Sequence, residues 1–133
     1  MSDKQFLVDT SIWIKCLREV NAPLQSYVSS LALNRQVFVS EIIVLEILKG
    51  AKSDREYQML KGDFLALPQL EINRDVWETA WELAYKLRKK GVNVPLTDAL
   101  ISALSLHYKC ILLHSDKHFR LIAEHTDLKE KEL

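Results

Sequence analysis

The chain has 133 residues, 48% of them hydrophobic, and its 18 Lys and Arg residues balance 18 Asp and Glu residues. This length and composition favour a single globular domain, which we expect to span residues 1–133, and the zero net charge argues against binding nucleic acid through overall charge. No apolar run is long enough to span a bilayer, and the N-terminus lacks the apolar core of a signal peptide. We therefore expect a soluble, cytoplasmic protein with no membrane partner.

The first stretch predicts a buried strand that ends at an acid. Residues 6–8 are apolar and favour β-structure, and Asp9, Thr10 and Ser11 follow directly. Apolar residues then recur at helical spacing, which predicts a helix capped by Thr10 or Ser11. Asp9 would lie at the carboxyl end of this strand, where open parallel α/β sheets bind their ligands.

The two cysteines are expected to be reduced core residues, with a disulfide as the alternative. Cys16 lies in this first helix and Cys110 in a later apolar run.

Strand and helix patterns alternate along the rest of the chain. The expected elements are a helix around residues 24–31, a strand over 37–39, helices over 41–49 and 53–64, a strand over 67–72, and helices over 74–90 and 98–108, followed by a strand over 110–113 and a helix over 117–124. Ser40, Asn73 and Thr97 are the expected helix caps. Residues 127–133 form at most a weak edge strand. The alternation predicts an α/β fold with a parallel sheet covered by helices on both faces.

Four acids occupy comparable places in this arrangement. Asp9 ends the first strand, Asp116 follows the last clear strand, Asp98 opens a helix, and Glu46 interrupts the apolar run over residues 42–48. Clustered carboxylates are the ligands that hard divalent cations such as Mg²⁺ and Mn²⁺ prefer, and such cations suit hydrolysis of a phosphodiester. Each acid alone also has a structural explanation, as a turn residue, a cap or an exposed helix position. Their joint placement is what favours a metal site.

The segments around these acids resemble the PIN-domain nucleases, and within them the VapC-type toxins of toxin–antitoxin pairs. Four blocks carry the resemblance, at residues 8–11, 40–50, 97–103 and 112–119, and it extends over residues 6–123. It implies a three-layer α/β/α PIN-like domain with a central parallel sheet of four or five strands. It also implies a metal-dependent endoribonuclease with an RNA substrate, a cognate antitoxin protein and a homodimeric assembly. Carried over by position, Asp9, Glu46, Asp98 and Asp116 become the catalytic and metal-binding acids, with Mg²⁺ as cofactor and Mn²⁺ as the other candidate.

Two histidines depart from the family pattern. Many relatives have a hydroxyl residue at the position of His114 and an acid at that of His118, which bears on whether a second metal is held tightly. A zinc site at these histidines is disfavoured, because no cysteine accompanies them. Several cations could contact an RNA backbone, namely Lys49, Lys52, Arg55, Lys117 and Arg120.

Apolar residues suggest contact surfaces as well as a core. Trp77 and Trp81 lie on the apolar face of the long helix and are expected to be core or interface anchors. The residues Leu24, Tyr27, Val28 and Leu31 could line a groove for an antitoxin segment or a dimer partner.

Three other functions compete with the nuclease. An aspartyl-nucleophile phosphatase would have a second acid two residues after Asp9, where Ser11 stands. A phospho-accepting receiver domain would have paired acids after the first strand and a lysine after a late strand, and neither pattern is evident here. The third alternative is a catalytically inert PIN-like module that binds RNA or protein, and the presence of all four acids argues against it.

Overall fold

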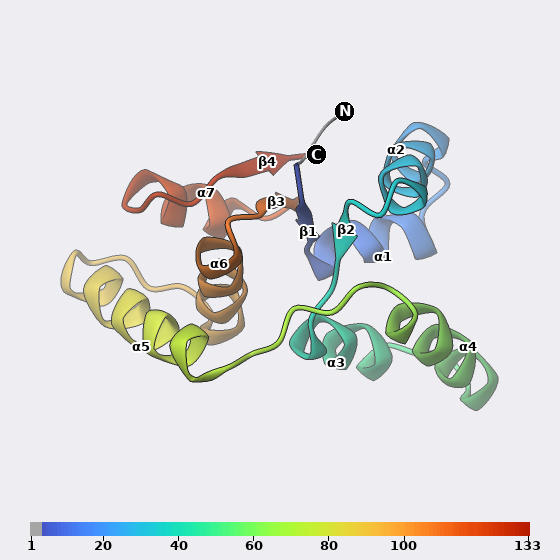
Figure 1. Ribbon diagram of the computed structural model, residues 1–133, viewed down its shortest axis with the longest axis horizontal. Coiled ribbons are helices and arrows are strands. Elements are labelled where there is room, and N and C mark those ends of the chain that lie inside the picture. The colour runs from blue at the N-terminus through green and yellow to red at the C-terminus, as the bar shows by residue number, and fades with distance from the viewer. Residues whose placement is uncertain (1–3) are drawn as a thin grey trace.

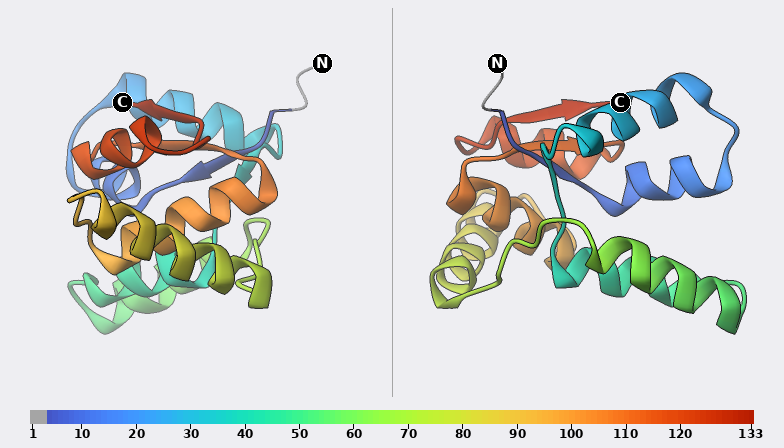
Figure 2. Two further views of the ribbon diagram at one scale, coloured as in Figure 1. Left: turned by 90° about the vertical axis from the view of Figure 1, so that its left-hand side faces the viewer. Right: turned by 45° about the vertical axis from the view of Figure 1, so that its right-hand side comes forward.

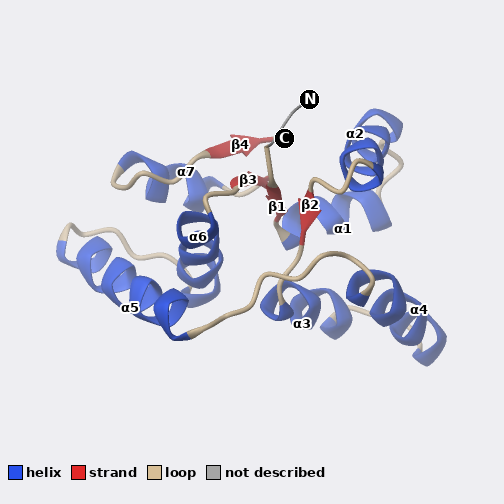
Figure 3. Cartoon of the chain, viewed as in Figure 1, coloured by secondary structure: helices blue, strands red, loops and turns tan. Residues whose placement is uncertain are grey.

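The computed structural model describes residues 4–133, so the first three residues of the predicted domain lie outside the described range. Within that range the chain forms four strands and seven helices (Figure 1 and Figure 3). In chain order they are β1 (Phe6–Val8), α1 (Thr10–Arg18), α2 (Ala22–Leu33), β2 (Val37–Phe38), α3 (Glu41–Lys49), α4 (Asp54–Leu65), α5 (Arg74–Lys89), α6 (Leu96–Tyr108), β3 (Ile111–His114), α7 (Lys117–Glu124) and β4 (Glu130–Glu132). Among residues 4–133, no helix is long and apolar enough to cross a membrane.

The strands form one parallel sheet in the order β2-β1-β3-β4. Leu7 of β1 lies between Phe38 of β2 and Leu112 of β3, and Leu113 of β3 is opposite Lys131 of β4. Parallel strands direct their carboxyl ends to the same edge of a sheet. The segments that follow β1 and β3 therefore meet at one edge, as the sequence predicted.

The sheet is buried on both faces, which confirms the predicted three-layer arrangement. Leu7 and Leu112 pack into a core with residues of α3 to α7, whereas Phe6, Val8 and Leu113 pack into a second core with residues of α1 and α2. Successive strand residues face opposite sides, so an uninterrupted apolar run supplies both cores. Figure 2 shows α1 and α2 on one side of β1 and α3 to α6 on the other.

Two predicted helix caps are wrong. The N-cap of α1 is Asp9, whose carboxylate accepts a hydrogen bond from the Ser11 backbone N–H, and the helix already begins at Thr10. Helix α6 begins at Leu96, because the Pro95 carbonyl accepts hydrogen bonds from the backbone N–H groups of Asp98 and Ala99. Thr97 consequently lies inside the first turn, and α6 has no side-chain cap.

The strand predicted over residues 67–72 is also wrong. A single parallel bridge joins Val39 and Gln69, in which Val39 N–H donates to the Pro68 carbonyl and Leu70 N–H donates to the Val39 carbonyl. Pro68 has no N–H with which to extend the ladder. The fourth strand is instead β4, the edge strand that the tail was expected to form at most weakly.

Helix α5 begins where predicted but exposes part of the face expected to be apolar and packed. Asn73 caps it by accepting a hydrogen bond from the Val76 N–H. Its buried residues are Val76, Ala80, Leu83 and Leu87, whereas Trp77 and Trp81 are 41% and 55% exposed. The two tryptophans are therefore surface residues, and a role as core anchors is excluded.

Candidate active site

Asp9 lies at the carboxyl end of β1 and is held there by Ser11. The Asp9 side chain is almost completely buried, with the residue 5% exposed. Its Oδ2 accepts hydrogen bonds from the backbone N–H of Ser11 at 2.9 Å and from the Ser11 hydroxyl at 2.5 Å. The Ser11 hydroxyl oxygen in turn accepts a hydrogen bond from the Ser115 N–H at 3.0 Å, which joins the turn after β1 to the turn after β3. Burial, with a smaller contribution from the charge of Asp116, raises the pKa of Asp9.

Glu46 reaches the same edge of the sheet from α3. The Thr10 hydroxyl donates a hydrogen bond to Glu46 Oε1 at 2.8 Å, across 36 positions of sequence. Burial, and then repulsion from Asp9, raises the pKa of Glu46, even though the Thr10 hydrogen bond and the charge of Lys49 act in the opposite direction. The apolar run around Glu46 is thus interrupted by a half-buried carboxylate that contacts Thr10 and lies near Asp9.

Asp98 has the largest shift in pKa of the four acids. It lies in the first turn of α6, is 8% exposed, and its Oδ2 atom is buried with no hydrogen-bond donor within residues 4–133. Burial, followed by repulsion from Asp116 and Asp9, raises the pKa of Asp98 to about 7. A buried carboxylate oxygen without a donor is costly unless a cation or a proton compensates it.

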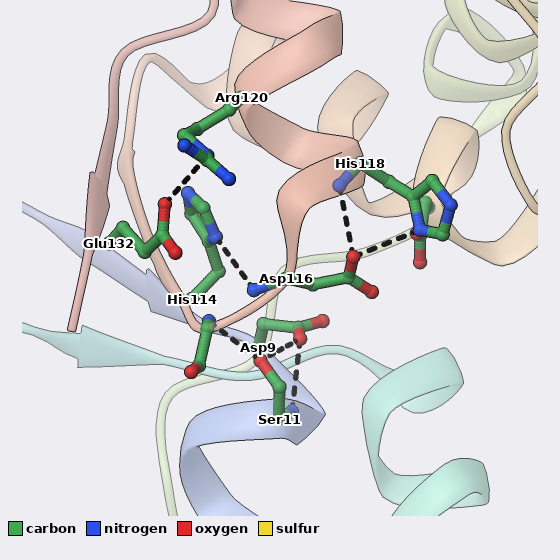
Figure 4. A network of polar contacts seen from close by, with 9 residues as sticks. Asp9, Ser11, His114, Asp116, His118, Arg120 and Glu132 are labelled. Atoms are coloured by element: carbon green, nitrogen blue, oxygen red, sulfur yellow. Dashed lines mark hydrogen bonds and ion pairs between the residues drawn. The ribbon is translucent and has the colours of Figure 1, made fainter.

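Asp116, at the N-cap of α7, and His118, in its first turn, complete the cluster (Figure 4). Asp116 caps α7 by accepting a hydrogen bond from the His118 N–H at 2.9 Å. The His118 ring lies close to both acids, with Nδ1 2.9 Å from Asp116 Oδ1 and 3.4 Å from Asp98 Oδ2. Figure 4 shows the carboxylate of Asp116 beside that of Asp9.

The four predicted acids lie near enough to influence one another's charge, although only Asp98 and Asp116, with His118, bring their ligand atoms into one tight group. Ligand atoms of Asp98, Asp116 and His118 lie within 4.8 Å of one another, and Asp98 Oδ2 has no other partner in the described part of the chain. Carboxylates so close together repel, and a divalent cation with oxygen ligands would relieve that repulsion. The residues present thus fit a divalent metal ion.

His114 supports the site from a buried position that the sequence did not predict. This histidine is fully buried at the end of β3, and its Nδ1 accepts a hydrogen bond from the Asp116 backbone N–H at 3.2 Å. Its Nε2 lies 3.4 Å from a Glu130 carboxylate oxygen and makes no hydrogen bond within residues 4–133. Its position directly after the apolar run 110–113 is the sequence feature that would have predicted an inward-facing side chain.

Comparison with known proteins matches most of the chain to one family. The family model of the PIN domain matches residues 6–125. Ribonuclease VapC11 from Mycobacterium tuberculosis is 28% identical in an alignment of 127 positions that covers 92% of this chain and 95% of that protein.

Solved structures show the same fold at lower sequence identity. VapBC2 from Rickettsia felis, bound to a DNA fragment from its promoter, superimposes with a TM-score of 0.83 at 20% identity, covering 96% of this chain and 98% of that one. DNA-bound VapBC from Salmonella typhimurium also gives 0.83, at 17% identity, covering 97% and 98%.

Proposed function

Because the chain belongs to the PIN domain family, we propose that it is a metal-dependent endoribonuclease that hydrolyses RNA phosphodiester bonds. One observation carries the proposal: Asp9, Glu46, Asp98 and Asp116 meet at one sheet edge, where a buried Asp98 oxygen has no donor within residues 4–133. A relative that aligns over almost its whole length is named a ribonuclease. An inert binding module, the alternative, offers no reason to hold four repelling acids together.

We assign these four acids as the residues that hold Mg²⁺ or Mn²⁺, directly or through water. A bound dication supplies activation of water and neutralises charge that develops on the phosphodiester. The protein orients the acids beforehand: Ser11 holds Asp9, and the Thr10 hydroxyl holds Glu46. Side chains whose positions are fixed before the substrate binds need little reorganisation during the reaction, so less free energy is spent on ordering them.

The basic residues near the site differ in whether they already form an ion pair within the chain. Lys49 acts on Glu46 through its charge, so it lies near enough to the site to be our candidate for contact with an RNA phosphate. Arg120, in contrast, forms an ion pair with Glu132 at 2.8 Å. We therefore propose Lys49 ahead of Arg120 as a phosphate contact.

The test is cleavage of a mixed cellular RNA pool by purified protein. We expect cleavage with Mg²⁺ or Mn²⁺, none in excess EDTA, and none by Asp9→Asn, which keeps the size of Asp9 but removes its charge. Undiminished cleavage by Asp9→Asn, or cleavage in EDTA, would contradict the metal mechanism. A folded, metal-binding parent that cleaves no RNA would favour the inert module.

We propose further that the protein is the toxin of a toxin–antitoxin pair and acts in the cytoplasm, where its RNA substrate lies. Several relatives of the same fold were solved as VapBC complexes. An apolar groove of about 280 Å³ between α1, α2 and α4 would accept an apolar antitoxin segment; its lining includes Trp13, Leu17, Val28, Leu60 and Phe64.

Expression of the chain alone should slow growth, and co-expression of the cognate partner should restore it. Unimpaired growth with abundant folded protein would count against the toxin and leave the nuclease standing.

A homodimer is the assembly we propose, with residues 1–133 as its single-domain subunit. Exposed Trp77, Trp81 and Tyr85 recur every fourth residue along α5, and aromatic residues of this kind dominate the energetics of interfaces. Sedimentation should give the mass of two chains. Trp81→Glu, which places a charge at the centre of this face, should shift the mass toward one chain.

A further inference from the structure

The imidazole of His118 points to the place where the carboxylates of Asp98 and Asp116 meet. We propose that His118 Nδ1 is a ligand of the bound metal, and that the site therefore prefers a first-row transition dication to Mg²⁺. This inference rests on the metal site of the proposed function and adds a nitrogen ligand to its four acids.

The distances suit three ligands of one ion. His118 Nδ1 is 2.9 Å from Asp116 Oδ1 and 3.4 Å from Asp98 Oδ2. Two ligands at right angles, each about 2.1 Å from an ion, lie about 3 Å apart. The three side chains come from α6, from the turn after β3 and from α7, so the fold itself brings them to this spacing.

The hydrogen bonding leaves the same atoms unsatisfied. Within the described residues, His118 Nδ1 and Asp98 Oδ2 are both buried and make no hydrogen bond. Nδ1 lies 2.9 Å from Asp116 Oδ1, as an ion pair, and that oxygen also accepts a hydrogen bond from the His118 backbone N–H. This backbone contact fixes the start of α7 against Asp116 and leaves the ring nitrogen and the Asp98 oxygen facing one another. Two buried polar atoms without hydrogen bonds, directed at one point, are what a metal ion would satisfy.

Ligand chemistry gives the direction of the preference. Mg²⁺ binds oxygen ligands and dehydrates reluctantly, whereas imidazole nitrogen favours first-row transition ions. An imidazole ligand also adds no negative charge to acids that already repel one another. The competing explanation is that His118 is only a cationic partner of Asp116, with no contact to the metal.

The experiment uses Mn²⁺ as the probe, with the full chain and no RNA. Electron spin-echo envelope modulation of bound Mn²⁺ detects a directly coordinated ¹⁴N nucleus. Isothermal titration then gives the affinities for Mn²⁺ and Mg²⁺. The variants are His118→Ala, which removes the nitrogen, and His118→Asp, which replaces it with oxygen. His125→Ala is the matched control, because His125 is an exposed histidine just beyond α7.

We expect the parent and His125→Ala to show ¹⁴N modulation and both His118 variants to lack it. His118→Asp should still bind Mn²⁺, with the ratio of Mn²⁺ to Mg²⁺ affinity reduced by about tenfold, as for loss of a residue that tunes a metal. Bound Mn²⁺ without ¹⁴N modulation in the parent, or modulation that survives His118→Ala, overturns the inference and leaves the acidic metal site intact. Failure of the parent to bind either ion refutes the metal site of the proposed function itself.

Discussion

Replacing Asp98 by asparagine should stabilise the metal-free protein at neutral and alkaline pH. The pKa of Asp98 is about 7 in the folded chain, raised from 3.8 first by burial and then by repulsion from Asp116 and Asp9. The folded state thus favours the protonated acid. Its contribution to stability is complete below pH 3.8 and is lost progressively as the pH rises through about 7.

The size of the effect follows from the shift. Moving the pKa from 3.8 to about 7 corresponds to an upper limit of about 4 kcal/mol, at 1.36 kcal/mol for each pH unit. The part of this free energy that comes from repulsion falls when neighbouring acids take up protons. The asparagine also loses about 0.5 kcal/mol of favourable interaction with the α6 dipole. We therefore expect Asp98→Asn to be more stable than the parent by about 2 kcal/mol at pH 8, with the difference vanishing near pH 4.

Urea unfolding in EDTA at pH 4, 6 and 8 measures this difference directly. The matched control is Asp75→Asn, since Asp75 also lies in the first turn of a helix but is exposed. It should lose about 0.5 kcal/mol at pH 8 through the helix dipole and gain nothing. If Asp98→Asn is no more stable than the parent at pH 8, or if its advantage does not grow between pH 4 and pH 8, the argument that Asp98 is held under repulsion is wrong.

Three further substitutions or treatments probe the surroundings of the site. Ser11→Ala removes the hydroxyl that binds Asp9 and accepts from the Ser115 N–H, so urea unfolding should show a loss of about 2 kcal/mol. Thr10→Val keeps the shape of the side chain but leaves Glu46 without its donor, and titration should show metal affinity reduced by about tenfold or more. Burial raises the pKa of the Cys110 thiol to about 11, so a thiol reagent at pH 8 should modify half-buried Cys16 first and reach Cys110 only on unfolding.

Patterns within short segments determined most of the fold. The sequence predicted α3 and α7 with their observed bounds, and the predicted cap of α5, Asn73, accepts a hydrogen bond from the Val76 N–H. These features depend on side-chain spacing and on contacts three or four residues apart, which are visible in the chain itself. The same patterns placed Asp9 and Asp116 after parallel strands, so their meeting at one sheet edge was also predictable.

The sequence left undecided whatever depends on contacts between distant segments. Residues 67–72 and the tail are both short and only weakly β-forming, and the tertiary structure decided between them, because Pro68 cannot extend a ladder while β4 can pair with the free edge of β3. Packing likewise left Trp77 and Trp81 partly exposed, because they flank the stripe of buried residues on α5.

For the site, too, the sequence predicted the residue types, whereas tertiary contacts decided their surroundings. The sequence alone supplied the four acids and the expectation that they share an edge. The hydrogen bond from Thr10 to Glu46 and the approach of His118 to Asp98 join segments with no local relation in sequence. The unsatisfied oxygen of Asp98 and its raised pKa depend on the burial of that carboxylate and on the approach of Asp116 and Asp9. Burial and the distance between charges are properties of the packed chain, and they determine which of the acids is held under the greatest electrostatic strain.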